Sequence, residues 1–314
     1  MKYMVFDSHC DTPFSLWRKS QRLEQTDCHI SLQGMEQLSG YAQFFAFCSL
    51  AGWKGGYTPE ELLKLPYAYF MQQLDQNQER VALCRSSEEL DCLQRQGKAA
   101  AFLSMEGAEC IQCDPGRLDD LAEMGLRMVS LTWNENNALA GCSHRDGPGL
   151  SAQGKEFVRR AQRLGMIVDL SHISDRAFYD VLDCAEKPVV ASHSNSRTLC
   201  GHSRNLTDHQ YRALCQHGGY TGINLFAAFL ADDRKADFET VYRHVDHFFQ
   251  LAGDSLHVAL GGDLDGCDVL PDGFSGVQNY NNLASCFEQK GFNTETIRDV
   301  YSNTMKRIVK QCIT

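Results

Sequence analysis

The stretch Val168-Asp169-Leu170-Ser171-His172 decides the fold, together with Ala191-Ser192-His193, whose histidine lies twenty-one residues further on. Each is a short apolar run that ends in a histidine, and a helical segment is predicted between them. In a parallel β/α fold, successive strands deliver their last side chains to one common face. Two histidines at one rim, with carboxylates from other strand ends, indicate a metal site. The alternative is that each histidine is a hydrogen-bonded core residue.

The composition limits the partners and the cellular location. The chain has 314 residues and a formal net charge of −10, without a basic tract, which argues against nucleic acid and anionic membranes. No apolar run reaches the ~18 residues that span a bilayer. The first residues lack the features of a signal peptide, so we expect a cytoplasmic protein. Its fourteen cysteines are then reduced thiols, and the close pair Cys110 and Cys113 lacks the second pair of a zinc ribbon.

Apolar runs recur along the chain, and most of them are followed by a helical pattern. Eight such units in about 300 residues are what a (β/α)8 TIM barrel requires. We find no linker rich in proline, glycine or serine, so we expect one domain over residues 1–314. The predicted strands cover residues 3–8, 41–50, 99–105, 127–133, 166–171, 188–192, 219–225 and 257–260.

The helices between these strands have their own signals. Residues 59–80 form a long amphipathic pattern, and capping-box patterns precede helices at Ser86 and Thr207. A last helix is predicted over 294–312. Residues 134–150 have no periodicity and follow a strand, which is a common place for a substrate-binding loop.

The polar residues at the predicted strand ends are all metal-ligand or acid–base types. His9 and Asp11 are two residues apart, so both would point to one side if the strand extends that far. Glu106 has two oxygens and can bind two ions at once. The alternatives are that Asp11 accepts a hydrogen bond from a nearby backbone amide in a turn and that Glu106 is a surface residue in a turn. The full set is His9, Asp11, Glu106, His172, His193 and Asp263.

A charge count favours the metal site. Two divalent ions bring +4, while Asp11, Glu106, Asp263 and a bridging hydroxide together bring −4, so no uncompensated charge is left in the cleft. Glycines before Asp263 would let the backbone approach closely, although Asp263 and Asp265 could also form a glycine-rich turn. Three further histidines in loops or at a helix start are expected to be solvated or to support the site: His144, His202 and His209.

Six motifs in this order resemble the membrane (renal) dipeptidase family, the zinc dipeptidases of peptidase family M19 among the amidohydrolase-like barrels. The resemblance runs nearly from end to end and is closest to the soluble bacterial branch. The motifs are His9-Cys10-Asp11-Thr12, Ser104-Met105-Glu106-Gly107, Asp169-Leu170-Ser171-His172, Ser192-His193-Ser194, Ser203-Arg204-Asn205 and Gly262-Asp263-Leu264-Asp265-Gly266.

The resemblance implies a role for each motif residue. His9 and Asp11 would bind one zinc ion, His172 and His193 a second, and Glu106 would bridge the two ions together with a water or hydroxide. By the same resemblance, the acid–base residue is Asp263 and the group that holds the substrate carboxylate is Arg204.

One position departs from the family pattern. Renal-type members carry a histidine after the fourth strand, where this chain has Trp133 followed by Asn134. An oxyanion role for that histidine therefore does not carry over. Asn134 or a metal ion could polarise the carbonyl instead, and we expect both Trp133 and Asn134 to contact the substrate.

The sequence thus predicts a metal-dependent dipeptidase in which a hydroxide between two zinc ions attacks the peptide carbonyl. The resemblance implies tolerance of a D-residue on the C-terminal side. One alternative is a hydrolase of lactones, β-lactams or N-acyl amino acids on the same site. Another is a metal-binding barrel without catalysis. The sequence leaves a homodimer open.

Overall fold

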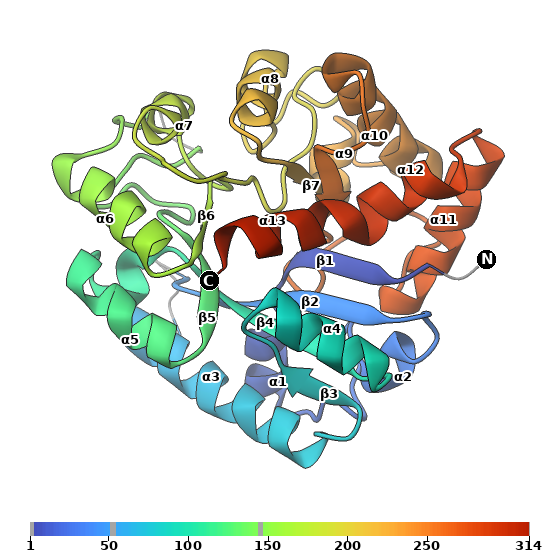
Figure 1. Cartoon of the computed structure of the whole chain (residues 1–314), viewed down its shortest axis with the longest axis horizontal. Coiled ribbons are helices and arrows are strands. Elements are labelled where there is room, and N and C mark those ends of the chain that lie inside the picture. The colour runs from blue at the N-terminus through green and yellow to red at the C-terminus, as the bar shows by residue number, and fades with distance from the viewer. Residues whose placement is uncertain (1–2, 51–54, 144–146, 314) are drawn as a thin grey trace.

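The computed structural model describes residues 3–50, 55–143 and 147–313. Its strands pair in parallel in the order β6-β5-β4-β2-β1-β8-β7, and β3 adds to β4 beside this path. Helices surround the strands (Figure 1). The strands are β1 (Val5–Cys10), β2 (Tyr41–Cys48), β3 (Val81–Leu83), β4 (Ala99–Glu106), β5 (Leu126–Ser130), β6 (Ile167–Asp169), β7 (Thr221–Ile223) and β8 (Val258–Leu260).

The predicted (β/α)8 barrel is confirmed, with one gap in its hydrogen-bond ladder. The predicted strand over 188–192 is present only as isolated parallel bridges, from Val190 to Asp169 and from Ala191 to Thr221. The ladder stops there because the next amide, that of Ser192, donates to the Asp169 carboxylate at 2.8 Å instead of to a backbone oxygen. The barrel therefore closes through single bridges between β6 and β7, at a point beside the predicted site.

The helices agree with the sequence where an amphipathic pattern was long. They are α1 (Thr12–Lys19), α2 (Leu32–Met35), α3 (Pro59–Gln76), α4 (Ser87–Arg95), α5 (Leu118–Glu123), α6 (Ala152–Arg163), α7 (Asp175–Leu182), α8 (Asp208–Gln216), α9 (Ala227–Leu230), α10 (Phe238–Ala252), α11 (Tyr280–Gln289), α12 (Thr294–Arg298) and α13 (Thr304–Cys312). The sequence analysis did not predict α1, α2, α9 or β3. The helix predicted over 294–312 is interrupted by a π-helical turn, Asp299–Asn303. No helix in the described part of the chain is long and apolar enough to cross a membrane.

Both predicted capping patterns begin a helix, but they differ in detail. At α8, Thr207 and Gln210 satisfy each other's backbone amides, which makes a complete capping box. At α4, Ser86 accepts from the amide of Glu89, while the Glu89 carboxylate accepts from Arg85 at 2.7 Å. The second pattern is therefore a single cap, because the glutamate binds the amide before the cap residue.

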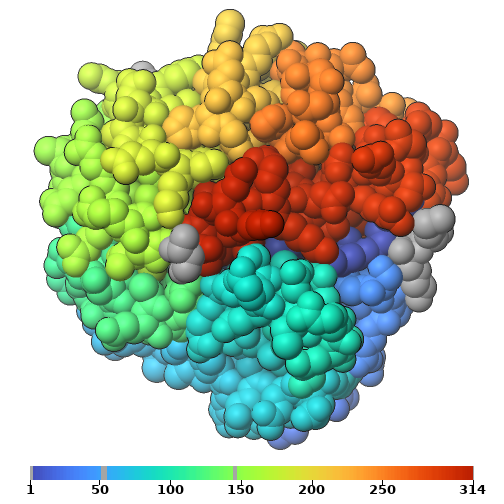
Figure 2. Space-filling view, in the orientation of Figure 1, coloured from blue at the N-terminus to red at the C-terminus, as the bar shows by residue number. Residues whose placement is uncertain are grey.

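Aromatic side chains fill one end of the barrel. Phe6, Phe44 and Phe102 stack there with ring centroids 4.9 to 6.1 Å apart. Helix α13 closes this end, since Met305 packs in the same cluster, and the helix lies across the strands in Figure 1. Its red atoms cover the centre of this face, beside the teal segment near residue 95 (Figure 2). Strand side chains alternate, so Glu106, four residues after Phe102, also points inward, at the opposite end of the barrel.

Candidate active site

The histidines predicted at the strand ends surround one glutamate. The Nε2 atoms of His172, His193 and His9 lie 2.9, 3.4 and 3.7 Å from Oε1 of Glu106. The Nε2 atoms of His172 and His193 are 3.0 Å apart, and the His9 and His193 rings stack at 3.8 Å. All four side chains are buried. Strands from different parts of the chain thus deliver their polar side chains to one point.

The carboxylates of Asp11 and Asp263 form a second group of possible ligands with His9. Ligand atoms of His9, Asp11 and Asp263 lie within 4.8 Å of one another, as do those of His9, Glu106 and His193. His9 belongs to both groups, so the two sets of ligands are adjacent. All six side chains that the sequence placed at strand ends are therefore together.

His9 and Asp11 reach the site differently from the prediction, which rested on strand alternation. The register between β1 and β2 shifts between Asp7 and Cys10, so a bulge turns His9 toward the mouth. Asp11 has left the extended conformation, with φ −103° and ψ 18°, and precedes α1. The two side chains converge through a bulge and a helix start.

Several buried atoms at this point have no hydrogen-bond partner in the described structure: His9 Nε2, Asp11 Oδ1 and Glu106 Oε1. Leaving carboxylate oxygens buried and unpaired is costly, so the arrangement fits positive ions between them. A side chain at Gly266 would collide with this set, because its Cβ would lie 2.3 Å from Asp11 Oδ2 and 2.4 Å from Asp263 Oδ1. Imidazole and carboxylate donors in this number suit zinc and similar divalent metals.

The protein alone leaves these acids and bases in unusual states. Burial raises the pKa of Asp11 well above its usual value, and the neighbouring Glu106 raises it further. Burial would also raise the pKa of Glu106, but His9 and His172 outweigh it and lower that pKa well below normal. Burial lowers the pKa of His172 to about 3, with Arg204 adding to the effect. A neutral imidazole is the form that binds a metal.

Hydrogen bonds on the far side of each ring fix the two histidines. Nδ1 of His172 lies 2.9 Å from Oδ1 of Asn134, an acceptor, so Nδ1 carries the proton and Nε2 faces Glu106 with its lone pair. Nδ1 of His193 lies 2.7 Å from Oγ of Ser192, which itself donates to Asp169 at 2.6 Å. The Ser192 oxygen then accepts from His193. Both rings are thereby held with Nε2 directed at the site.

Asp263 is positioned by two buried partners. Its Oδ2 accepts from Nδ2 of Asn224 at 3.0 Å, and its backbone amide donates to the carbonyl of His9 at 3.1 Å. Burial raises the pKa of Asp263 above its usual value, and the interaction with His9 is the largest of the effects that lower it. Asp7 ties the same loop to β1, because its carboxylate accepts from the amides of His9 and Gly262 at 2.9 and 3.0 Å. One Asp263 oxygen, Oδ1, is left toward the metal ligands.

Asp265 has the turn role that the sequence left open. Its two oxygens accept from Thr12 Oγ1 and from the amide of His29, both at 2.6 Å. These bonds hold the loop after β8 against the start of α1. We therefore assign Asp265 to the framework of the site.

A cavity of about 400 Å³ opens above the ligand groups. Arg204 lines it and is 3% exposed. Its hydrogen bonds are long, 3.5 Å to Ser194 Oγ and 3.3 Å to the carbonyl of His193, and its Nε has no partner. No salt bridge to Arg204 occurs among the described residues. A buried guanidinium with unused N–H groups is suited to an anionic group of a ligand.

The other predicted residues lie in or near this cavity. Trp133 and Asn134 line it, and the Trp133 ring is 6.4 Å from that of His172. His202 is also in the wall, with Nδ1 accepting from the amide of Arg204 at 3.2 Å. His209 is exposed, as expected, and His144 lies outside the described residues.

The sequence analysis missed residues that support the site. Asn224 lies near the end of the predicted strand 219–225 and directly after β7, so its position at a strand end was a usable signal. Asp169 stood in the quoted motif without a role. Phe226 and Phe229 line the cavity beside Arg204, whose Cζ lies 5.6 Å from the Phe229 ring. No pattern marked these two, because they come from a loop and the short helix α9.

Comparison with known proteins shows which family this chain matches. A family model described as membrane dipeptidase (peptidase family M19) matches residues 1–313. Dipeptidase tcpJ of Claviceps purpurea (strain 20.1) is 32% identical over 238 residues, which make up 74% of this chain and 56% of that protein. This chain thus spans little more than half of that relative.

Solved structures share the fold over its whole length. The metallo peptidase dipeptidase AC, of family M19, has a TM-score of 0.91 at 24% identity, over 100% of this chain and 99% of that one. A metallo peptidase from Rhodobacter sphaeroides, liganded with a phosphinate mimic of the dipeptide L-Ala-D-Ala, has a TM-score of 0.90 at 23% identity, over 99% and 100%. At such identities the likeness establishes the fold.

Proposed function

This chain belongs to the membrane dipeptidase family, peptidase family M19, and from that premise we propose that it hydrolyses dipeptides with a pair of zinc ions. One observation carries the proposal. Ligand atoms around Glu106 and the buried guanidinium of Arg204, whose Nε has no hydrogen-bond partner among the described residues, lie at one cavity. A dipeptide offers a carbonyl for the first group and a carboxylate for the second.

We assign the metal ligands from the resemblance to the family, and the imidazole and carboxylate donors present are consistent with that assignment. His9 and Asp11 would hold one ion, His172 and His193 the other, and Glu106 would contact both. When bound, the ions supply Lewis acidity, which polarises the scissile carbonyl and lowers the pKa of the attacking water. A metal-binding barrel without catalysis is not supported, because the acid–base candidate Asp263 stands beside the ligands.

Asp263 is the residue to which we assign proton transfer. Asn224 occupies its Oδ2, and its Oδ1 remains free to take a proton from the attacking water and pass it to the leaving amine. Burial, which raises the pKa of Asp263, favours a group that can hold that proton between the two steps. Asn224 keeps the acceptor oxygen in place.

Arg204 would bind the C-terminal carboxylate of the substrate, and its planar fork matches that group. We propose that this anchor contacts the leaving residue through its carboxylate, so a D-side chain is tolerated there. Trp133 and Asn134 would form the wall near the scissile bond. The Asn134 oxygen is taken by His172, so only its amide nitrogen is left to contact the carbonyl.

We also propose that the protein works in the cytoplasm. Support comes from the fourteen cysteines, all of which are free in the structure, as expected in a reducing compartment.

The experiment is a substrate panel on the zinc-loaded protein, with products identified by liquid chromatography. The panel contains an L,L-dipeptide, the L,D-dipeptide, the amidated dipeptide, an N-acetyl amino acid, a lactone and a β-lactam. We expect both dipeptides to be cleaved fastest. Faster cleavage of the lactone, the β-lactam or the N-acetyl amino acid would replace the dipeptidase assignment with the alternative hydrolase.

A further inference from the structure

A second cavity, of about 480 Å³, lies at the end of the barrel opposite the active site. Tyr41 and Ala99, the first residues of β2 and β4, line it. The catalytic cavity is lined by Cys48 and Glu106, the last residues of the same strands. Eight extended residues span about 23 Å, so the two cavities are well separated. The volume is in the usual range of small-molecule sites, about 300–1,000 Å³.

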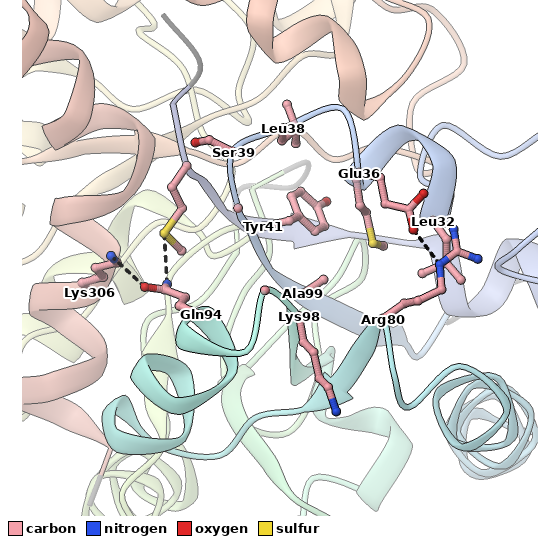
Figure 3. Close-up of a pocket in the computed structure, with 14 residues that line it drawn as sticks. Leu32, Glu36, Leu38, Ser39, Tyr41, Arg80, Gln94, Lys98, Ala99 and Lys306 are labelled. Carbon is pink, nitrogen blue, oxygen red and sulfur yellow. Dashed lines mark hydrogen bonds and ion pairs between the residues drawn. The ribbon is translucent and has the colours of Figure 1, made fainter.

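The floor of this second cavity is apolar. Leu32, Met35, Leu38 and Tyr41 line it and are buried. They come from α2, the turn after it and the start of β2. In Figure 3, Tyr41 lies in the middle of the cavity, with Leu38 above it and Ala99 below. An apolar part of a ligand would contact these side chains.

The rim is cationic and only partly neutralised. Arg80 pairs with Glu36 at 2.6 Å and also lies 3.8 Å from Glu24, so the charge of Arg80 is neutralised. Lys306, on α13, has a hydrogen bond to the uncharged Gln94 at 3.3 Å. In Figure 3 this lysine lies on the side of the cavity away from the Arg80–Glu36 pair.

Lys98 is the third cation of the rim. Lys98 forms an ion pair with Glu79 at 3.9 Å. The Glu79 side chain is 88% exposed, so the pair is weak. Among the described residues that line the cavity, Arg80, Lys98 and Lys306 are cationic and Glu36 is anionic, in a chain whose net charge is −10. Asp91, which does not line the cavity, also acts on the Lys306 ammonium group. Burial lowers the pKa of Lys306 below its usual value, which is the effect of partial loss of water around its ammonium group.

We propose that this second cavity binds a small amphipathic anion, with an apolar body on the Leu32–Tyr41 floor and a carboxylate, sulfonate or phosphate head at Lys98 and Lys306. A cavity of this volume is too small for a folded partner, and the cationic rim disfavours cations. The site is separate from the catalytic cavity, because none of the described residues lines both.

The test uses fluorescence titration of the zinc-loaded protein with anilinonaphthalene sulfonate, an aromatic anion. We expect saturable binding of one probe per chain, displaced by decanoate and not by decylammonium. The double variant Lys98→Gln/Lys306→Gln should bind about tenfold or more weakly, since it loses two charge-assisted contacts. Lys98→Arg/Lys306→Arg should retain binding. Lys310→Gln, an exposed lysine on the same helix, is the matched control and should bind like the wild type.

Any of four results would overturn the proposal. The first is equal displacement by decanoate and decylammonium, and the second is unchanged binding in the Lys→Gln double variant with its thermal unfolding intact. The third is loss of binding in Arg204→Ala, which would place the probe in the catalytic cavity. The fourth is absence of saturable binding to the wild type. Dipeptide hydrolysis is measured separately, so failure here leaves the dipeptidase assignment untouched.

Discussion

Replacing Arg204 with alanine should separate the recognition of the substrate carboxylate from the chemistry. The guanidinium is buried, its two side-chain hydrogen bonds are long, and Nε has no partner. Most of its hydrogen-bonding capacity is therefore available to a ligand. A hydrogen bond to a charged group contributes about 1.5–3 kcal/mol. At about 1.4 kcal/mol per factor of ten, Arg204→Ala should lower kcat/KM for a dipeptide about 10–150-fold.

The assay compares a dipeptide with its C-terminal amide. The amide has no carboxylate, so the wild type should cleave it at least about 100-fold less well, and Arg204→Ala should change that low rate little. Arg204→Lys should fall between wild type and Arg204→Ala, because a point charge replaces the planar fork. Arg212→Ala, an exposed arginine on α8, is the control and should behave like wild type.

The thermal stability of Arg204→Ala must be measured as well, because unfolding of the variant would also lower its activity. Removing a buried charge that has no salt bridge in the described structure should leave the unfolding temperature of Arg204→Ala unchanged or raise it. A large drop would mean that the loss of activity reflects unfolding. Equal cleavage of acid and amide by the wild type would refute the carboxylate anchor, and so would an equal loss on both substrates in the variant.

Three further predictions follow from the same geometry. Asp263→Asn should keep its zinc, by metal analysis, while kcat falls by about 10²–10⁴; near-normal kcat would reassign the proton transfer. Asp169→Asn should weaken zinc binding about 10–100-fold in a chelator competition, because it loosens the hydrogen bond to Ser192 that orients His193. The control is Asp175→Asn, at an exposed ion pair with Arg197, which should leave zinc binding unchanged. Burial lowers the pKa of His244 in the folded state to about 4. As the pH falls below about 6.5, the His244 side chain is therefore protonated first in the unfolded state. Folding stability is lost between about pH 6.5 and pH 4, by about 3 kcal/mol in total. His244→Gln should flatten that part of the stability–pH curve in chemical denaturation, and an unchanged slope would argue against a neutral buried His244.

The sequence predicted that these side chains converge, and for Glu106 the reason is that strand alternation is a local property. Phe102, Ser104 and Glu106 share one face of β4, so the inward direction of Glu106 follows from counting residues. His172 and His193 were found from another local signal, since each ends a short apolar run. The barrel followed from repetition of that unit.

What the sequence did not predict depends on contacts between distant segments. The bulge that turns His9 toward the mouth is set by the register of β1 against β2. The predicted strand at 188–192 is interrupted by a side-chain bond from Asp169. Asn224 acquires its role only when β7 lies beside the loop that carries Asp263. None of these relations has a signature in a single local stretch.

The most direct test of the central claim is a zinc titration of the metal-free protein, with bound metal and L,D-dipeptide hydrolysis measured on the same samples. The unpaired atoms of His9, Asp11 and Glu106 predict no activity without metal and full activity only as the second equivalent per chain binds. Full hydrolysis in a sample shown to be free of metal would contradict the account.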